Sequence, residues 1–288
     1  MRALRVAGVV RAASDKSISH RALILSAVAK GKSRISQLLA SADVESTAIA
    51  LRAIGADIPA LSPRLVVTGQ SARHLKSPRL ALDCGNSGTT ARLLAGVIAG
   101  AGLTAKFVGD ASLSRRPMRR IAEPLRAMGA QVDLTPHGGL PMTIHGGPLT
   151  AIDWESAVAS AQVKSAILLA AVLAGIAARV REPHRSRDHT ERMLGARGIQ
   201  VHVAGETVEL EPGQIVRPAD VVVPADPSSA AYFVALALMA DAGELRLSDV
   251  CLNPTRTGLL EALRRMGGEI EIEERREEGG EHVGTIVA

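Results

Sequence analysis

The residues best suited to chemistry lie between Asp83 and Leu94, in the stretch DCGNSGTTARLL. Small polar residues open an apolar run there, as they do at the start of a capped helix. Such a start presents unpaired backbone N–H groups and the positive end of a helix dipole, which together suit an anion. Gly88 lets a ligand approach the backbone closely, and Arg92 adds a positive charge one turn later. An ordinary capped helix after a glycine turn would give the same pattern.

The chain repeats this helix start three more times, in DKSISHRA from residue 15, SAQVKSA from residue 160 and DPSSAA from residue 226. A second signature alternates with the first and joins a helix end, a glycine and a strand start, as in LRAIGADI at 51–58. Its glycines recur roughly every 70 residues, a fixed period that marks internal repeats: Gly55, Gly129, Gly198 and Gly267. The pattern predicts four copies of one unit with the order β-α-β-α-β-β, and therefore an α/β fold.

Three copies form a natural closed set, so we expect a domain boundary near residue 222. The fourth copy then opens a second domain, where a lone unit has little against which to pack its apolar helix face. In the third copy, Thr190 is predicted to cap the second helix.

Composition narrows the class of partner. Only 1% of the 288 residues are aromatic, and the net charge is +5 with arginine well above lysine. Proteins that grip single-stranded nucleic acid need stacking aromatics, so a small anion is the favoured partner. The longest apolar run, 166–178, falls short of the roughly 20 residues of a membrane span. Two distant cysteines and the lack of a secretion signal predict a cytoplasmic protein with no membrane or nucleic-acid partner.

Seven blocks, taken in order, resemble the EPSP synthase family (3-phosphoshikimate 1-carboxyvinyltransferase), particularly its second bacterial sequence class. They are DKSISHRA, GNSGT with Arg92, GDASLSRRPM, SAQVKSAILLA, RDHTERML, DPSSAAYF and NPTRTGL. The family folds as an inverse α/β barrel of two domains, each of three βαβαββ units, that close like jaws. The resemblance implies a strand of the second domain at 1–13, a complete three-unit domain at 14–222, and the first unit of an incomplete second domain at 223–288.

The resemblance also implies an activity. Members of the family transfer an enolpyruvyl group from phosphoenolpyruvate to the 5-hydroxyl of shikimate 3-phosphate with release of phosphate, in the shikimate pathway of aromatic amino acid biosynthesis. No metal or organic cofactor is needed. Both substrates are phosphorylated carboxylates, which helix starts and arginines are suited to hold together.

The matching motifs also imply which residues of this chain contact the substrates. Lys16, Gly88 and Arg116 resemble phosphoenolpyruvate contacts, and Lys16 is also the catalytic candidate. The remaining substrate-binding candidates, with Gln162 expected to touch both substrates, are Ser17, Arg21, Asn86, Thr89, Arg92, Ser160, Ala161, Gln162 and Arg187. Gly88 leaves a small side at the phosphoenolpyruvate pocket, so the resemblance implies that the family's herbicide glyphosate fits there, provided that the closed site forms.

Structural interpretations stay open beside these. Ser17 and Ser160 also fit helix caps, and Gln162 fits a helix-surface residue. Arg187 fits a surface ion pair with Asp188 or Glu191, and Lys16 fits a solvated lysine. Asp188 and His189 look like a catalytic pair, but we expect a structural role, because adjacency alone does not make a general base.

The family's main acid/base groups, an aspartate, a glutamate and a lysine, belong to its second domain, and the resemblance implies that they lie beyond residue 288. Proton transfer needs such groups in position. We therefore expect an N-terminal portion that is nearly inactive without a complementary C-terminal EPSP synthase fragment. The alternative is a non-catalytic remnant that binds shikimate 3-phosphate. A related enolpyruvyl transferase that acts on a UDP-sugar is disfavoured, because Cys84 lies inside the helix-start motif.

Overall fold

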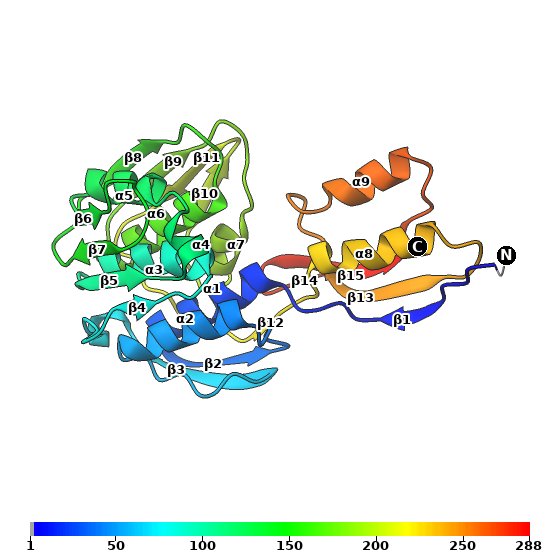
Figure 1. Ribbon diagram of the computed structural model, residues 1–288, viewed down its shortest axis with the longest axis horizontal. Coiled ribbons are helices and arrows are strands. Elements are labelled where there is room, and N and C mark those ends of the chain that lie inside the picture. Colours follow the sequence, from blue (N-terminus) through cyan, green and yellow to red (C-terminus); the bar gives the residue numbers. More distant parts are fainter. Residues whose placement is uncertain (1–2) are drawn as a thin grey trace.

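The computed structural model describes residues 3–288 and has two lobes of unequal size (Figure 1). Three small sheets and their helices form the larger lobe, and a fourth sheet with two helices forms the smaller one. Buried apolar side chains form two separate clusters, a large one between residues 18 and 251 and a small one drawn from Ala12 and the segment 225–286. Within the described residues, no helix is both long enough and apolar enough to cross a membrane.

Four repeated units make up these lobes. The first contains α1 (Lys16–Val28), β2 (Lys30–Ser36), α2 (Ala42–Ala53), β3 (Arg64–Gln70) and the 3₁₀ turn η1 (Ala72–His74). The second contains β4 (Leu82–Asp83), α3 (Gly88–Gly100), β5 (Ala105–Val108), α4 (Ala111–Ser114), α5 (Arg119–Ala127), β6 (Gln131–Leu134) and β7 (Met142–His145). The third contains β8 (Ile152–Glu155), α6 (Ala161–Ala174), β9 (Ala178–Arg181), α7 (His189–Gly195), β10 (Val201–Ala204) and β11 (Thr207–Leu210).

The fourth unit, in the smaller lobe, contains α8 (Pro227–Leu238), β13 (Leu245–Cys251), α9 (Gly258–Arg265), β14 (Glu271–Glu278) and β15 (Glu281–Val287). Its first strand is β1 (Gly8–Val10), which pairs in parallel with β13. In the larger lobe, β12 (Val221–Val222) takes the corresponding place and pairs in parallel with β2. The first and fourth units thus exchange opening strands, since β1 precedes the first unit but pairs in the fourth, and β12 precedes the fourth unit but pairs in the first.

One strand order recurs in the sheets. The second, third and fourth units have the orders β4-β5-β7-β6, β8-β9-β11-β10 and β1-β13-β15-β14. The first unit has β12-β2-β3, and its remaining strand is reduced to a single bridge between Asp57 and Thr68. The shared order confirms the four copies that the sequence predicts.

The four repeat glycines end helices α2, α5, α7 and α9 in the same way. Their φ angles are +93°, +102°, +79° and +95°, at Gly55, Gly129, Gly198 and Gly267. In each case the glycine N–H bonds the carbonyl three residues back and the next N–H bonds the carbonyl five residues back, which is the Schellman motif. In three repeats a preceding arginine also donates from Nε to the carbonyl six residues later, at 2.8–3.0 Å: Arg52, Arg126 and Arg264.

Helices α3 and α6 pack closely side by side. A Cβ added at Gly96 or Gly100 of α3 would lie 2.2 or 2.5 Å from the carbonyl oxygen of Ala166 or Ala170 in α6. Only glycine allows the two backbones to come so close. Helices α1, α3 and α6 are buried along most of their length and form the centre of the larger lobe.

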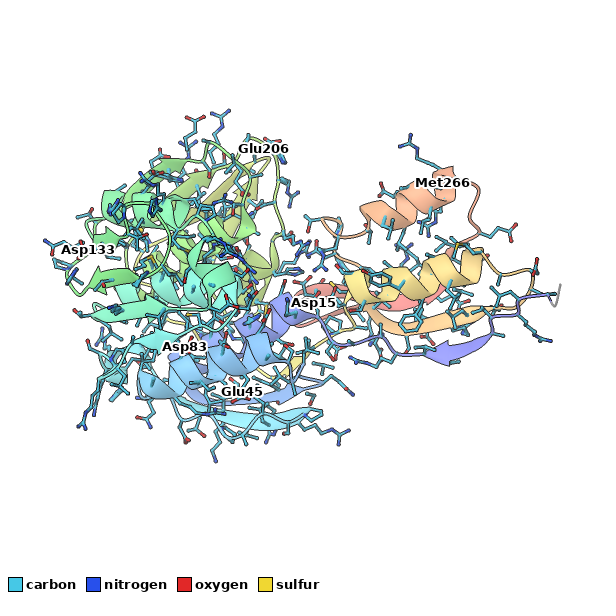
Figure 2. All side chains as sticks on the ribbon, in the orientation of Figure 1. Asp15, Glu45, Asp83, Asp133, Glu206 and Met266 are labelled. Carbon is cyan, nitrogen blue, oxygen red and sulfur yellow. The ribbon has the colours of Figure 1, made fainter. Side chains whose placement is uncertain are left out.

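The chain crosses between the lobes twice, and the two crossings pair with each other. The Asp15 N–H donates to the Pro224 carbonyl, and the Asp226 N–H donates to the Ala13 carbonyl, both at 2.8 Å. Asp15 lies at this junction (Figure 2). Since Asp15 and Asp226 also cap α1 and α8, the starts of these helices are fixed at the junction.

Candidate functional site

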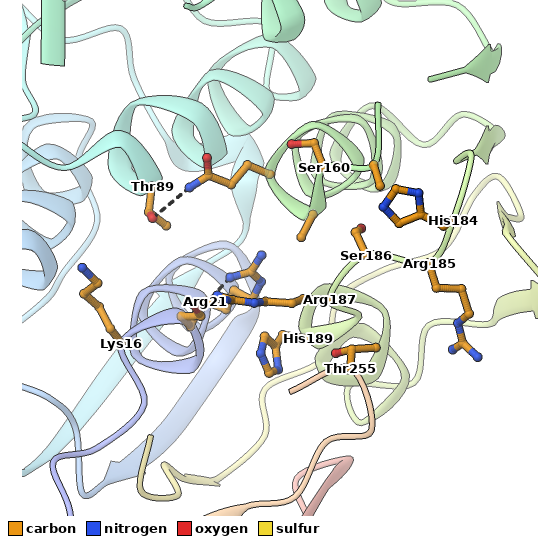
Figure 3. A pocket seen from close by; sticks show the side chains of 14 residues that line it. Lys16, Arg21, Thr89, Ser160, His184, Arg185, Ser186, Arg187, His189 and Thr255 are labelled. Carbon is orange, nitrogen blue, oxygen red and sulfur yellow. Dashed lines mark hydrogen bonds between the residues drawn. The ribbon is translucent and has the colours of Figure 1, made fainter. Parts of the chain in front are cut away.

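A cavity of about 480 Å³ opens where α1, α3 and α6 begin (Figure 3). Its other walls are the loop between β9 and α7 and one residue of the smaller lobe. The lining residues are Lys16, Ser17, Arg21, Thr89, Ala159, Ser160, Ala161, Gln162, His184, Arg185, Ser186, Arg187, His189 and Thr255. Eight of the twelve substrate-binding candidates are among them. The fourth helix start, that of α8, does not line the cavity.

Local capping fixes the three helix starts. Ser87 Oγ accepts from the Thr90 N–H of α3 at 3.2 Å, and Ser160 Oγ accepts from the Val163 N–H of α6 at 3.5 Å. The first turns of α1, α3 and α6 contain no acidic residue. The positive ends of all three helices therefore face the cavity, and the one carboxylate that caps them, Asp15 of α1, is paired with Arg256 at 3.0 Å.

Asp15 caps α1 and accepts from the Ile18 N–H at 2.9 Å. Ser17 is thus not the cap of α1 but lies in the first turn and lines the cavity. Ser160 caps α6 and lines the cavity as well, so the two roles do not exclude each other.

Arg21 is a buried cation whose hydrogen-bond partners are all neutral. Only 4% of Arg21 is exposed, and it donates to Thr190 Oγ1 (2.7 Å), Ser165 Oγ (2.8 Å) and the Ser17 carbonyl (3.0 Å). Burial lowers its pKa to about 10, so it stays charged at neutral pH. A guanidinium has five N–H donors. Two terminal donors of Arg21 are therefore left for an anion in the cavity.

Thr190 does not cap α7, contrary to the prediction. It is the second residue of the helix, whose N-cap position is occupied by Asp188 without a side-chain cap bond. Its hydroxyl instead bonds Arg21 and lies 2.6 Å from Ser165 Oγ. The capping pattern misled because a threonine next to a helix start can equally turn inward toward a buried cation.

Arg187 forms no ion pair within 4.0 Å among residues 3–288. The two acidic residues considered as its partners are engaged elsewhere: Asp188 pairs with Arg192 at 3.0 Å, and Glu191 pairs with Lys164 at 2.8 Å. Partial burial and the nearby Arg256 lower the pKa of Arg187. An exposed cavity arginine of this kind is open to an incoming phosphate or carboxylate.

Gln162 links the cavity to a second group of candidates. Its Nε2 donates to Thr89 Oγ1 at 3.1 Å, drawn in Figure 3, and its Oε1 accepts from Arg92 Nη1 at 2.6 Å. Gln162 therefore bridges α6 and α3. Burial, together with Arg120 and Arg116, lowers the pKa of Arg92, so positive charge is concentrated on this side.

Asn86, Gly88 and Arg116 lie next to Arg92 and outside the lining of the cavity. Arg116 Nη2 donates to Asn86 Oδ1 at 2.6 Å, and Asn86 Nδ2 donates to Asp110 Oδ2 at 2.6 Å. A Cβ at Gly88 would lie 3.1 Å from Arg92 Nη1 and 3.3 Å from Arg116 Nη1. The structure thus brings together all twelve candidates, as two neighbouring zones joined by Gln162.

Lys16 is half-exposed and pairs with Asp43 of α2, at 2.8 Å between Nζ and Oδ2. It lines the cavity at its outer edge (Figure 3). The interpretation of Lys16 as a solvated lysine agrees with its exposure, but it does not account for the ion pair with Asp43. An anion that reaches Lys16 must share the ammonium group with Asp43.

Asp188 and His189 join the two lobes. Asp188 Oδ1 accepts from Asn253 Nδ2 at 2.6 Å, and His189 Nδ1 lies 2.7 Å from Glu281 Oε1. His189 Nε2 lies 3.3 Å from Arg256 Nη1. With both ring nitrogens in contact with protein groups, His189 fits the expected structural role.

Arg256 is a residue that sequence reasoning missed. It donates to Asp15 Oδ2 at 3.0 Å and to Asp226 Oδ1 at 2.8 Å, so one guanidinium holds the caps of α1 and α8 together. Its block, NPTRTGL, is part of the family resemblance, but the partners of Arg256 are 241 and 30 residues away in the sequence. No local spacing reveals such a contact.

Residues 2–285 match the protein family described as EPSP synthase (3-phosphoshikimate 1-carboxyvinyltransferase). The chain belongs to the EPSP synthase family. Relatives called 3-phosphoshikimate 1-carboxyvinyltransferase include one from Alkalilimnicola ehrlichii, 47% identical over 97% of this chain, and one from Geobacillus thermodenitrificans, 46% identical over 97%. The chain spans 63% and 65% of the length of these two relatives.

A solved EPSP synthase from Acinetobacter baumannii superposes with a TM-score of 0.92 at 40% identity. The match covers 99% of this chain and 66% of that one. This similarity confirms the EPSP synthase-like α/β fold that the sequence predicts.

Proposed function

We propose that this chain supplies the shikimate 3-phosphate and phosphoenolpyruvate sites of an EPSP synthase, which transfers enolpyruvyl from the second substrate to the 5-hydroxyl of the first and releases phosphate. The observation that carries the proposal is the convergence of three helix starts with the buried Arg21, whose protein partners are neutral. Positive helix ends and a desolvated guanidinium together favour a phosphorylated carboxylate.

The two zones divide the substrates between them. Shikimate 3-phosphate is assigned to the cavity, with Ser17, Arg21, Ser160 and Arg187 as its contacts. Phosphoenolpyruvate is assigned to the neighbouring zone of Gly88, Arg92, Arg116 and Asn86, extended by Lys16. Gln162 lies between the zones with Thr89 and Ala161, and holding both substrates there would bring the hydroxyl and the enol ether together.

The catalytic groups within the cavity are few. Among the described residues, no aspartate or glutamate lines it. Lys16 remains the candidate for proton transfer, and it is shared with Asp43. General acid–base catalysis of both proton transfers needs further groups. Binding without turnover by this chain alone therefore belongs to the proposal, and a binding-only remnant stays the second candidate.

The exposed apolar face of α8 is the observation that favours a complementary segment. Tyr232 is 81% exposed, Met239 73% and Leu236 41%, whereas α3 is buried along most of its length. An apolar helix face of this size is normally covered. We propose that two further βαβαββ units cover it, so that 14–222 acts as a complete domain and 223–288 as the first unit of a second.

A cytoplasmic location is part of the same proposal and rests on the two buried free cysteines.

Isothermal titration of the purified chain with shikimate 3-phosphate tests the binding step. Arg187→Ala should weaken binding by about tenfold or more, because a charge-assisted hydrogen bond is lost. Arg73→Ala, at an exposed position in η1, is the matched control and should leave binding unchanged. Equal affinity of the Arg187 variant and the wild type would contradict this placement of the substrate.

Mixing the chain with the C-terminal third of a relative tests the complementary segment. Phosphate release should appear only in the mixture. Leu236→Asp on α8 should abolish that gain and leave shikimate 3-phosphate binding intact. Binding without any gain in activity on mixing would favour the binding-only remnant, and robust turnover by the chain alone would refute the need for a partner.

A further inference from the structure

Glu182, the residue that follows β9, holds a buried carboxylate directly behind the cavity. Its side chain is 2% exposed. The Ser160 N–H at the start of α6 donates to Oε1 at 2.9 Å. From the loop that carries Arg187, the Ser186 N–H donates to Oε2 at 3.3 Å, and the Ser186 hydroxyl lies 2.7 and 2.8 Å from the two oxygens. One carboxylate thus ties two walls of the cavity together.

Lys164 completes this arrangement. It is the only charged residue of α6, and its Nζ lies 2.8 Å from Glu182 Oε2 and 2.8 Å from Glu191 Oε1. All three side chains are at most 4% exposed. Burial alone would lower the pKa of Lys164, but the two carboxylates outweigh it and raise the pKa. The ammonium therefore stays charged between two acids.

The same cluster reaches Arg21 through its neighbours in sequence. Ser165 follows Lys164, Thr190 precedes Glu191, and these two hydroxyls are the partners of Arg21. Desolvation makes such a cluster a weak source of stability, and apolar residues of similar volume often serve as well. What the cluster adds is a fixed position for the groups that line the cavity.

We infer that Glu182 is a positioning residue, which together with Lys164 fixes the loop bearing Arg187 against the start of α6 and so sets the geometry of the anion site. The inference deepens the proposed function and rests on it for the identity of the ligand. Glu182 itself does not line the cavity. It acts through its hydrogen bonds to Ser160 and Ser186, and through Ser186 on the loop between β9 and α7.

The substitution Glu182→Gln keeps the shape of the side chain and removes its charge. It withdraws an acceptor from Lys164 and from Ser186. We expect binding of shikimate 3-phosphate to weaken by about tenfold or more, since hydrogen bonds to a charged group are lost. Glu209→Gln on β11, an exposed glutamate paired with Arg179, is the matched control and should bind as the wild type does.

A double-mutant cycle separates positioning from general destabilisation. If Glu182 acts through the loop, Arg187→Ala should weaken binding much less in the Glu182→Gln background than in the wild type. Lys16 lies on α1 and pairs with Asp43, so Lys16→Ala should have the same effect in both backgrounds. Additive effects of Glu182→Gln and Arg187→Ala would overturn the inference.

Hydrogen exchange provides a readout that needs no ligand. Glu182→Gln should speed amide exchange in residues 184–188 and at Ser160, whereas unchanged exchange would overturn the positioning role. If Glu182→Gln does not fold, Ser186→Ala removes the hydroxyl bonds to Glu182 while the buried carboxylate keeps its ion pair with Lys164, and it should speed exchange in the same loop. Failure of the wild type to bind shikimate 3-phosphate would refute the proposed function alone, and equal binding by wild type and Glu182→Gln would refute this inference alone.

Discussion

Replacement of Arg21 by methionine separates binding from stability most clearly. The guanidinium has two N–H donors free for an anion once its three protein contacts are made. Each charge-assisted hydrogen bond contributes about 1.5–3 kcal/mol. Loss of two should therefore weaken shikimate 3-phosphate binding by at least about 3 kcal/mol, or about two orders of magnitude in Kd.

The stability of the same variant should change little. Ser165 Oγ and Thr190 Oγ1 lie 2.6 Å apart and keep each other as partners when Arg21 is removed. The change also removes the cost of burying a cation. That cost is seen in the pKa of Arg21, which burial lowers to about 10. We expect the free energy of unfolding to change by no more than about 2 kcal/mol.

Isothermal titration measures the binding, and urea denaturation followed by circular dichroism measures the stability. Arg179→Met, at a half-exposed arginine of β9, is the matched control and should alter neither quantity appreciably. A Kd for Arg21→Met within threefold of the wild-type value would refute the assignment of Arg21 to the anion. A large loss of stability with normal Kd would mean that the buried guanidinium is structural.

Three further substitutions test other parts of the account. Burial raises the pKa of Glu191, and a carboxyl of this kind stabilises the fold at low pH and loses that contribution as pH rises through its folded-state value. Glu191→Gln should therefore gain stability relative to the wild type in urea titrations as pH rises above about 4, the ordinary pKa of a glutamate; a constant difference would contradict this. Gly88→Ala should displace the guanidinium groups of Arg92 and Arg116 and weaken phosphoenolpyruvate binding by about tenfold in the presence of shikimate 3-phosphate. Calorimetry that finds both substrates equally affected would argue against separate zones. Arg256→Met leaves two helix-capping carboxylates without their partner and should lower the free energy of unfolding by about 3–5 kcal/mol. A variant as stable as the wild type would show that the junction does not depend on this ion pair.

Local patterns in the sequence predicted the helix starts and ends well. Ser87 and Ser160 cap their helices, and the four repeat glycines have the positive φ that a Schellman end requires. These features depend on a few neighbouring residues, so spacing alone reveals them. The recurring strand order follows from the same repeat.

Long-range contacts could not be predicted in this way. Pairing of β12 with β2 joins residues more than 180 positions apart, and no local pattern indicates it. Lys164 gave one usable signal, because a lone charge in an otherwise apolar helix must find a partner. Its partners Glu182 and Glu191 lie 18 and 27 residues later, on a strand end and another helix. The hydroxyl of Thr190 was assigned to the wrong partner for the same reason.

A crystal structure of the chain soaked with shikimate 3-phosphate tests the central claim most directly. We predict density for the ligand in the cavity at the starts of α1, α3 and α6, with its anionic groups within hydrogen-bond distance of Arg21, Arg187 and Ser160. Density elsewhere on the molecule, with these side chains unchanged and the cavity occupied by solvent, would contradict it.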